Sequence, residues 1–242
     1  MTNRLWIIPA LICSASAMAA TDTIYVQASR GSFNDAAIHK LFSQSPQLQS
    51  ELEFSGTPTN AFQRADEQNA LAFVAVANST IDGKLVQATV DAMEQYQVTE
   101  LKGFITTPIE MCVLMNSKDV ASEQPITLLA SHPAALKQIN GWKATVQAKE
   151  LEVPEGTAAA AKKVSEQELP AGTAAVGACV LDSAYPDLSI VARGVQDNKN
   201  NRTSFILAEV AKRDAPVNEE QARIVLQQVI DDGIKLYGEN LQ

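Results

Sequence analysis

Four short polar stretches combine hydroxyl and amide side chains, which can bind and orient small anions. Each lies beside an apolar, strand-like run, and several come directly before a helix-like run, whose first backbone N–H groups carry partial positive charge. The arrangement suits a small anion such as a carboxylate, although helix capping by Ser, Thr and Asn explains any single stretch more simply. The stretches are Asn78-Ser79-Thr80, Ser131-His132-Pro133, Gly156-Thr157-Ala158 and Asn201-Arg202-Thr203.

Thr203 stands where a polar run ends and a strand-like run begins. Its hydroxyl is either the last polar group of a turn or a hydrogen-bond donor held at the entrance of a strand. A metal centre is not expected nearby, because the only two histidines, His39 and His132, are far apart and no CxxC or HExxH spacing exists. We therefore expect neither a metal nor a cofactor.

The segments that must position these residues alternate between strand and helix, which predicts an α/β fold. Residues 70–77 form a continuous apolar run typical of a strand that is buried on both faces of a parallel sheet. Turn signals in the middle of the chain suggest two lobes, with the polar stretches facing a cleft between them. Further strands are expected at 23–28, 126–131, 149–154, 188–195 and 204–210, and one or two strands, broken near Pro108, at 99–116. Helices are expected at 32–42, 85–96, 131–142, 157–167 and 218–238, whereas 173–185 fits either.

Residues 1–19 have the pattern of a secretory signal peptide. Arg4 precedes an apolar run too short to span a bilayer, and Ala17-Met18-Ala19 fits a cleavage site. We expect a periplasmic or secreted protein without a stable membrane anchor. Removing residues 1–19 deletes one positive charge, so the net charge moves from -9 to -10. Such an acidic chain is a poor partner for nucleic acid or for anionic membranes.

Two cysteines, Cys112 and Cys179, remain after residue 19. An oxidising compartment would allow them to form a disulfide. Each lies inside an apolar stretch, however, so the favoured interpretation is two buried free thiols that act as small hydrophobic side chains.

Six segments follow one another between Tyr25 and Leu207, and they are RGSFNDAAIHKLF, FVAVANSTIDGKLVQATVDAM, LKGFITTPIEMCVLM, SHPAALKQINGW, EGTAAAAKKV and VARGVQDNKNNRTSFIL. In this order they resemble the prephenate dehydratase family. The resemblance implies a two-lobed α/β domain of the type II periplasmic-binding kind, with the active site in the interlobe cleft. We place this domain at 20–212, followed by an amphipathic helix packed on it at 213–242.

The resemblance assigns catalytic roles to Thr203, Asn78 and Gln138. In this family the threonine hydroxyl helps the ring hydroxyl of prephenate to leave, and loss of water and carbon dioxide gives phenylpyruvate. Asn78 and Gln138 would position the substrate and donate hydrogen bonds to its oxygens. The remaining matched hydroxyl residues are assigned to binding the substrate, and they are Ser32, Ser79, Ser131 and Thr157.

Among the departures from the pattern of the family, two affect the expected site. Ala77 stands where the family has a glutamate, and Ser204 stands where it has an arginine. We expect the first change to remove a polar group from the pocket wall and the second to remove a partner for a substrate carboxylate. Arg30 or Arg202 could supply the missing charge.

The first functional hypothesis is an exported lyase that converts prephenate to phenylpyruvate; decarboxylation without dehydration is a related possibility, which retention of Thr203 disfavours. The second is an exported solute-binding protein that holds a small carboxylate without turnover. The altered positions favour the second, whereas retention of the three catalytic candidates favours the first. About 35 residues follow Leu207, which is 242 minus 207, too few for the regulatory ACT domain usual in the family. Members of the family often pair, so a homodimer is compatible with the resemblance.

Overall fold

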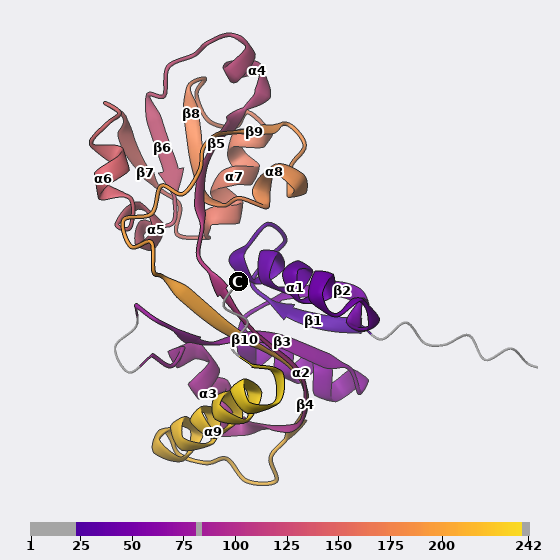
Figure 1. Cartoon of the computed structure of the whole chain (residues 1–242). Coiled ribbons are helices and arrows are strands. Elements are labelled where there is room, and N and C mark those ends of the chain that lie inside the picture. The colour runs from indigo at the N-terminus through magenta and orange to yellow at the C-terminus, as the bar shows by residue number, and fades with distance from the viewer. Residues whose placement is uncertain (1–22, 81–83, 239–242) are drawn as a thin grey trace, which may run out of the picture.

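The computed structural model describes residues 23–80 and 84–238, which form two lobes stacked end to end (Figure 1). Each lobe is built on a sheet of five strands. The expected signal peptide at residues 1–19 lies outside the described residues. Within the described residues, no helix is both long enough and apolar enough to cross a membrane.

The first lobe holds a mixed sheet with the strand order β2-β1-β3-β10-β4. Strand β3 pairs parallel with β1 and antiparallel with β10, so the expectation of a parallel environment holds on one side of β3 only. The strands are β1 (Thr23–Gln27), β2 (Glu51–Gly56), β3 (Leu71–Asn78), β4 (Tyr96–Pro108) and β10 (Arg202–Lys212), and the helices are α1 (Phe33–Gln44), η1 (Pro46–Leu48), α2 (Pro58–Gln68), α3 (Gln87–Gln95) and α9 (Glu219–Tyr237).

The second lobe has the strand order β7-β6-β8-β5-β9. The ambiguous segment at 173–185 supplies both a strand and a short helix, β8 and α8. The strands are β5 (Met111–Asn116), β6 (Leu128–Ser131), β7 (Lys149–Glu152), β8 (Thr173–Ala178) and β9 (Leu188–Ala192), and the helices are α4 (Ser117–Ala121), α5 (Pro133–Leu136), α6 (Asn140–Lys143), α7 (Thr157–Ser165) and α8 (Leu181–Ala184).

The chain crosses between the lobes twice, from β4 into β5 and from residues 193–201 into β10 (Figure 1). The two crossings are hydrogen-bonded to each other. The Ile109 N–H donates to the Asn201 carbonyl at 2.9 Å, and the Val195 N–H donates to the Met111 carbonyl at 3.0 Å. The Gln196 side chain accepts from the Met111 N–H at 3.0 Å. These bonds fix the backbone at the floor of the interlobe cleft.

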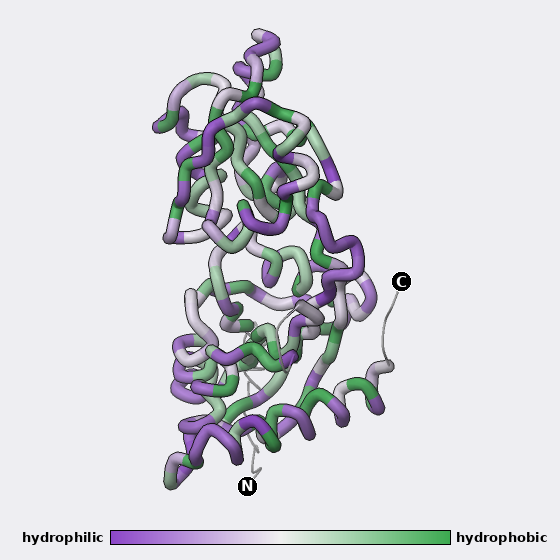
Figure 2. Tube along the Cα trace, turned by 90° about the vertical axis from the view of Figure 1, so that its left-hand side faces the viewer, coloured by the Kyte–Doolittle hydropathy of each residue, from purple (hydrophilic) through white to green (hydrophobic). Residues whose placement is uncertain are grey.

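Helix α9 covers one face of the first sheet, as its apolar spacing predicts. It begins with a capping box between Asn218 and Gln221 and buries Ala222, Leu226 and Ile230. Hydrophobic and hydrophilic residues alternate along its length (Figure 2).

Residues 131–142, expected as one helix capped by Ser131, instead form the two short helices α5 and α6. The Asp197 carboxylate accepts hydrogen bonds from the N–H groups of Asn140 and Gly141, both at 2.8 Å, and so caps the start of α6. The N-cap of α5 is His132. Long-range capping therefore divides a segment that its own apolar spacing would leave continuous.

The interpretation of Cys112 and Cys179 as free thiols was wrong, because the two residues form a disulfide. Cys112 lies in β5, and Cys179 follows the end of the neighbouring strand β8. Apolar surroundings are equally compatible with a buried disulfide, so the flanking residues could not distinguish the two states.

We expect the double substitution Cys112→Ala/Cys179→Ala to lower the free energy of unfolding by about 2–4 kcal/mol, because the disulfide closes a long loop in the unfolded chain. Urea unfolding followed by circular dichroism measures this change. A reductant should destabilise the wild-type protein similarly and leave the double variant unaffected. Equal stability of the oxidised wild type and the double variant would contradict the expectation.

Candidate active site between the lobes

A β-bulge at the end of β3 decides which side chains face the interlobe cleft. Thr203 lies opposite Asn78 and Ser204 opposite Ala77, but the register then shifts, so that Val76 is the extra residue. Side chains alternate between the two faces of a strand, so an extra residue moves every side chain that follows it to the other face of the sheet. The bulge therefore places Asn78 on the same face as Thr203.

The side chains of Asn78 and Thr203 are joined by a hydrogen bond of 2.7 Å from the Asn78 amide nitrogen to the threonine oxygen. The Asn78 amide oxygen accepts from the backbone N–H of Thr80 at 2.8 Å and also from the Thr80 hydroxyl, which fixes the orientation of the amide. Thr203 is thereby the acceptor in its bond with Asn78, and its own hydrogen can be donated elsewhere.

Asn201 connects this pair to the second lobe. Its side-chain oxygen accepts from the Asn78 amide at 3.0 Å, and its side-chain nitrogen donates to the Gln138 oxygen at 3.2 Å. Gln138 stands in the break between α5 and α6, and its carbonyl accepts from the Asp197 N–H at 2.7 Å. All three catalytic candidates of the sequence analysis thus belong to one hydrogen-bonded chain.

This chain of side chains borders a cavity of about 310 Å³, here called the amide cavity. The lining combines apolar side chains with neutral amide and hydroxyl groups, and no side chain among the described lining residues is charged or titrates near neutral pH. The two lobes both contribute. The lining residues are Phe33, Asn34, Asn78, Thr80, Val86, Ile109, Met111, Ala135, Gln138, Asn201, Thr203 and Phe205.

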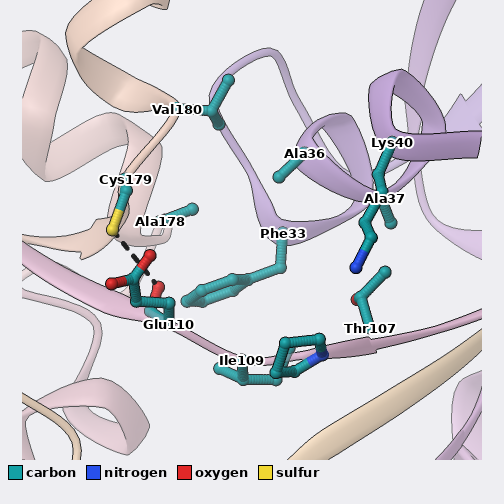
Figure 3. Close-up of a pocket in the computed structure, with 11 residues that line it drawn as sticks. Phe33, Ala36, Ala37, Lys40, Thr107, Ile109, Glu110, Ala178, Cys179 and Val180 are labelled. Carbon is teal, nitrogen blue, oxygen red and sulfur yellow. Dashed lines mark hydrogen bonds between the residues drawn. The ribbon is translucent and has the colours of Figure 1, made fainter. Parts of the chain in front are cut away.

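A second interlobe cavity of about 180 Å³ adjoins the first, with Phe33 and Ile109 lining both. Figure 3 shows the Phe33 ring extending from α1 toward Ile109 and Glu110, while Lys40 reaches toward Thr107. Phe33 therefore stands between the two cavities.

The remaining predicted binding residues are not brought to the amide cavity. Ser131 is fully buried and its hydroxyl donates to the Val176 carbonyl at 2.5 Å. Ser32 accepts from the Asp35 N–H at 3.2 Å and caps α1, as its position before that helix predicts. These contacts fit structural roles better than substrate contact.

Thr157 and Ser79 also lie outside the lining of this cavity. Thr157 is the first residue of α7, and its side chain packs close to Gly177. Ser79 is exposed, and its hydroxyl accepts from the Arg202 N–H at 2.9 Å. Its contacts join the end of β3 to the start of β10.

The expected effects of Ala77 and Ser204 on this cavity were wrong. The two residues face each other across β3 and β10, on the face of the sheet opposite to Thr203. Arg202 borders that same opposite face, and neither Arg202 nor Arg30 lines the amide cavity. The departures from the family pattern thus leave the Asn78–Thr203 pair intact.

The expectation that Asn78 donates to the substrate also changes. Both hydrogens of its amide are engaged, one with Asn201 and one with Thr203. Asn78 therefore orients Thr203. Gln138 donates to the Ala134 carbonyl at 3.0 Å and to no other acceptor in the described part of the chain, so a second N–H remains for a ligand. The described residues contain no group of three or more His, Cys, Asp or Glu side chains placed to hold a metal ion.

The model of the prephenate dehydratase family matches residues 24–213. The chain belongs to the prephenate dehydratase family. A search of curated protein sequences finds no match.

Solved structures show the same fold at low sequence identity. The prephenate dehydratase of Arthrobacter aurescens in complex with L-Phe superposes with a TM-score of 0.62 at 21% identity, covering 81% of this chain and 61% of that one. The prephenate dehydratase of Staphylococcus aureus subsp. aureus Mu50 superposes with a TM-score of 0.58 at 18% identity, covering 79% of this chain and 68% of that one. GqqA, described as a novel type of quorum quenching acylase, superposes with a TM-score of 0.58 at 20% identity, covering 81% of this chain and 66% of that one. This chain thus spans less than two thirds of the length of two of these three proteins.

Asn201 is the main site residue that sequence reasoning did not assign. It is the first residue of the polar stretch that ends in Thr203, within a segment that resembles the family. Its place two residues before Thr203 was therefore the signal that could have identified it as a site residue. The residue is only 3% exposed, and its side chain joins Asn78 to Gln138 across the cleft.

We expect Asn201→Leu, which removes both polar atoms at similar size, to lower the free energy of unfolding by about 1–3 kcal/mol, because partly buried amides lose a partner. Urea unfolding measures the loss. The matched control is Asn200→Leu, since the Asn200 side chain is exposed and makes none of these bonds. An equal effect of the two substitutions would show that the bridge contributes nothing specific.

Proposed function

We propose that the protein is a lyase that converts prephenate to phenylpyruvate with loss of water and carbon dioxide. The observation that carries the proposal is the hydrogen bond of 2.7 Å from Asn78 to Thr203 at the edge of the amide cavity. It leaves the threonine hydrogen available to a ligand. Membership of the family supplies the reaction, and the geometry supports Thr203 as the donor.

In the proposed reaction the ring C–O bond breaks while the Thr203 hydroxyl donates a hydrogen bond to the departing oxygen, which takes up a proton from solvent and leaves as water. The C–C bond to the ring carboxylate breaks at the same time, and its electron pair enters the ring as carbon dioxide leaves. The product ring is aromatic, so the intrinsic driving force is large. A fixed donor in a mainly apolar cavity stabilises the charge that develops on the oxygen.

The lining of the amide cavity also has consequences for binding. Phe33, Met111 and Phe205 offer apolar surface for the substrate ring, and Gln138 retains an N–H for a substrate oxygen. Prephenate carries two carboxylates, and no described lining residue is cationic. We therefore propose that the substrate is held by neutral hydrogen-bond donors and binds more weakly than at a site with a bidentate arginine.

An acylase activity like that named for GqqA has less support. Acyl transfer by a threonine hydroxyl needs an adjacent general base. Among the described residues that line the amide cavity there is no His, Asp or Glu. A hydrogen-bond donor suffices for the departure of a hydroxyl group, and the site provides one.

We further propose that the protein works in the periplasm or outside the cell. The disulfide between Cys112 and Cys179 supports this proposal, because such bonds persist in oxidising compartments. The signal-peptide pattern of residues 1–19 supports it independently.

Replacing Thr203 tests the proposed donor. We expect Thr203→Val to lower kcat for prephenate by about 10²–10⁴-fold, because the hydroxyl is lost at nearly constant size, and Thr203→Ser to retain most activity. The rate is followed by the absorbance of phenylpyruvate in alkali, with a protein-free reaction subtracted because prephenate aromatises spontaneously in acid.

His132→Ala is the control for that experiment, since His132 caps α5 and does not line the cavity. Equal rates for wild type and Thr203→Val would contradict the proposed role of the hydroxyl. Tight binding of prephenate without any product would instead identify a solute-binding protein.

The lining of the amide cavity also predicts the pH dependence. Because Thr, Asn and Gln do not titrate in this range, kcat should vary less than about threefold between roughly pH 6 and pH 9. Initial rates in buffers of constant ionic strength measure the profile. A bell-shaped profile inside this range would mean that a titrating acid or base carries the reaction, and it would argue against a neutral donor.

A further inference from the structure

A separate cavity of about 290 Å³ lies on the opposite face of the first sheet from Thr203. It is called here the reverse-face cavity. Asn78 borders both it and the amide cavity, but the two cavities share no other lining residue. The lining residues are Ala77, Asn78, Ser79, Lys84, Thr106, Arg202, Ser204 and Ile234.

The cavity is found at two of the positions that depart from the pattern of the resemblance. Ala77 and Ser204 are direct partners across β3 and β10. Side chains at such positions have Cβ atoms about 4.5–5.5 Å apart, so the glutamate and arginine that the resemblance implies there would be placed for an ion pair. In this chain two small side chains stand at these positions, and they leave room for a ligand.

The lining of the reverse-face cavity is cationic. Lys84 and Arg202 both border it, and no acidic residue belongs to the described lining. Across the described part of the chain, neither of these two side chains forms an ion pair or a side-chain hydrogen bond. Two cations beside a hollow, with no acidic partner among residues 23–80 and 84–238, attract a small anion.

Hydroxyl groups complete the lining. Thr106 and Ser204 lie 2.9 Å apart, oxygen to oxygen, and one of them must donate to the other, which leaves the second hydrogen available. A guanidinium presents a fork of N–H donors that matches phosphate and carboxylate oxygens, and an ammonium adds a point charge. The combination fits an oxyanion rather than a halide.

We propose that the reverse-face cavity binds a small oxyanion, a phosphate or carboxylate group, through Arg202 and Lys84 with help from the hydroxyls of Ser204 and Thr106. The site does not depend on catalysis in the cleft. The two cationic residues, Lys84 and Arg202, also accept backbone hydrogen bonds from the end of β3 and the residue after it. The Lys84 carbonyl accepts from the Asn78 N–H at 2.7 Å, and the Arg202 carbonyl accepts from the Ser79 N–H at 2.9 Å.

Isothermal titration with inorganic phosphate tests the proposal, with acetate in a parallel titration and chloride at matched ionic strength as the background. Saturable binding of phosphate, acetate or both above the chloride background is expected. The anion with the lower dissociation constant is the one whose group the site prefers. Arg202→Gln and Lys84→Gln should each weaken binding by about 10–100-fold, the effect of losing one charge-assisted hydrogen bond. Lys162→Gln is the matched control, because Lys162 is an exposed lysine of the other lobe.

A second variant tests the origin of the cavity. Ala77→Glu/Ser204→Arg restores a cross-strand pair, fills the space and should abolish oxyanion binding without changing the net charge. Thermal unfolding followed by circular dichroism shows whether this variant folds, and if it does not, Arg202→Gln decides alone. The proposal is overturned if neither oxyanion binds above chloride, if Lys162→Gln weakens binding as much as Arg202→Gln, or if the folded double variant binds as the wild type does.

Discussion

The pairing of β10 between β3 and β4 is the interaction on which both cavities depend. Strand β10 brings the chain back from the second lobe and inserts antiparallel to both neighbours. Its alternating side chains are divided between the two faces of the sheet, with Thr203 and Phe205 on the cleft side and Ser204 on the reverse side. A shift of the register by one residue would exchange the two sets.

The sequence predicted the two-lobed α/β architecture because the alternation of apolar strands and amphipathic helices is strong through most of the chain. It also predicted Asn78, Gln138 and Thr203 as a group, since each lies in a segment that matches the family. Residues 51–68 were left without an element, although β2 and α2 form there, because these segments are polar and only partly buried. Their structure depends on pairing with β1 and packing on the sheet.

Other features could not be predicted because they depend on contacts distant in sequence. The bulge at Val76 decides the face on which Ala77 stands, and alternation alone would have put it in the cleft. Asp197 divides one expected helix into two and thereby places Gln138 at the cavity. Ser131 has the right type and position for a ligand contact, but its burial against Val176 is a property of the folded sheet.

The disulfide has a mechanical consequence that follows from its place in the fold. Cys112 and Cys179 both belong to the second lobe, so the covalent bond joins neighbouring strands inside that lobe and does not join the lobes. Any change in the angle between the two halves must therefore be accommodated by the crossings around Ile109 and Asn201. Oxidation makes one half of the molecule more rigid and leaves rotation about the two backbone crossings covalently unrestricted.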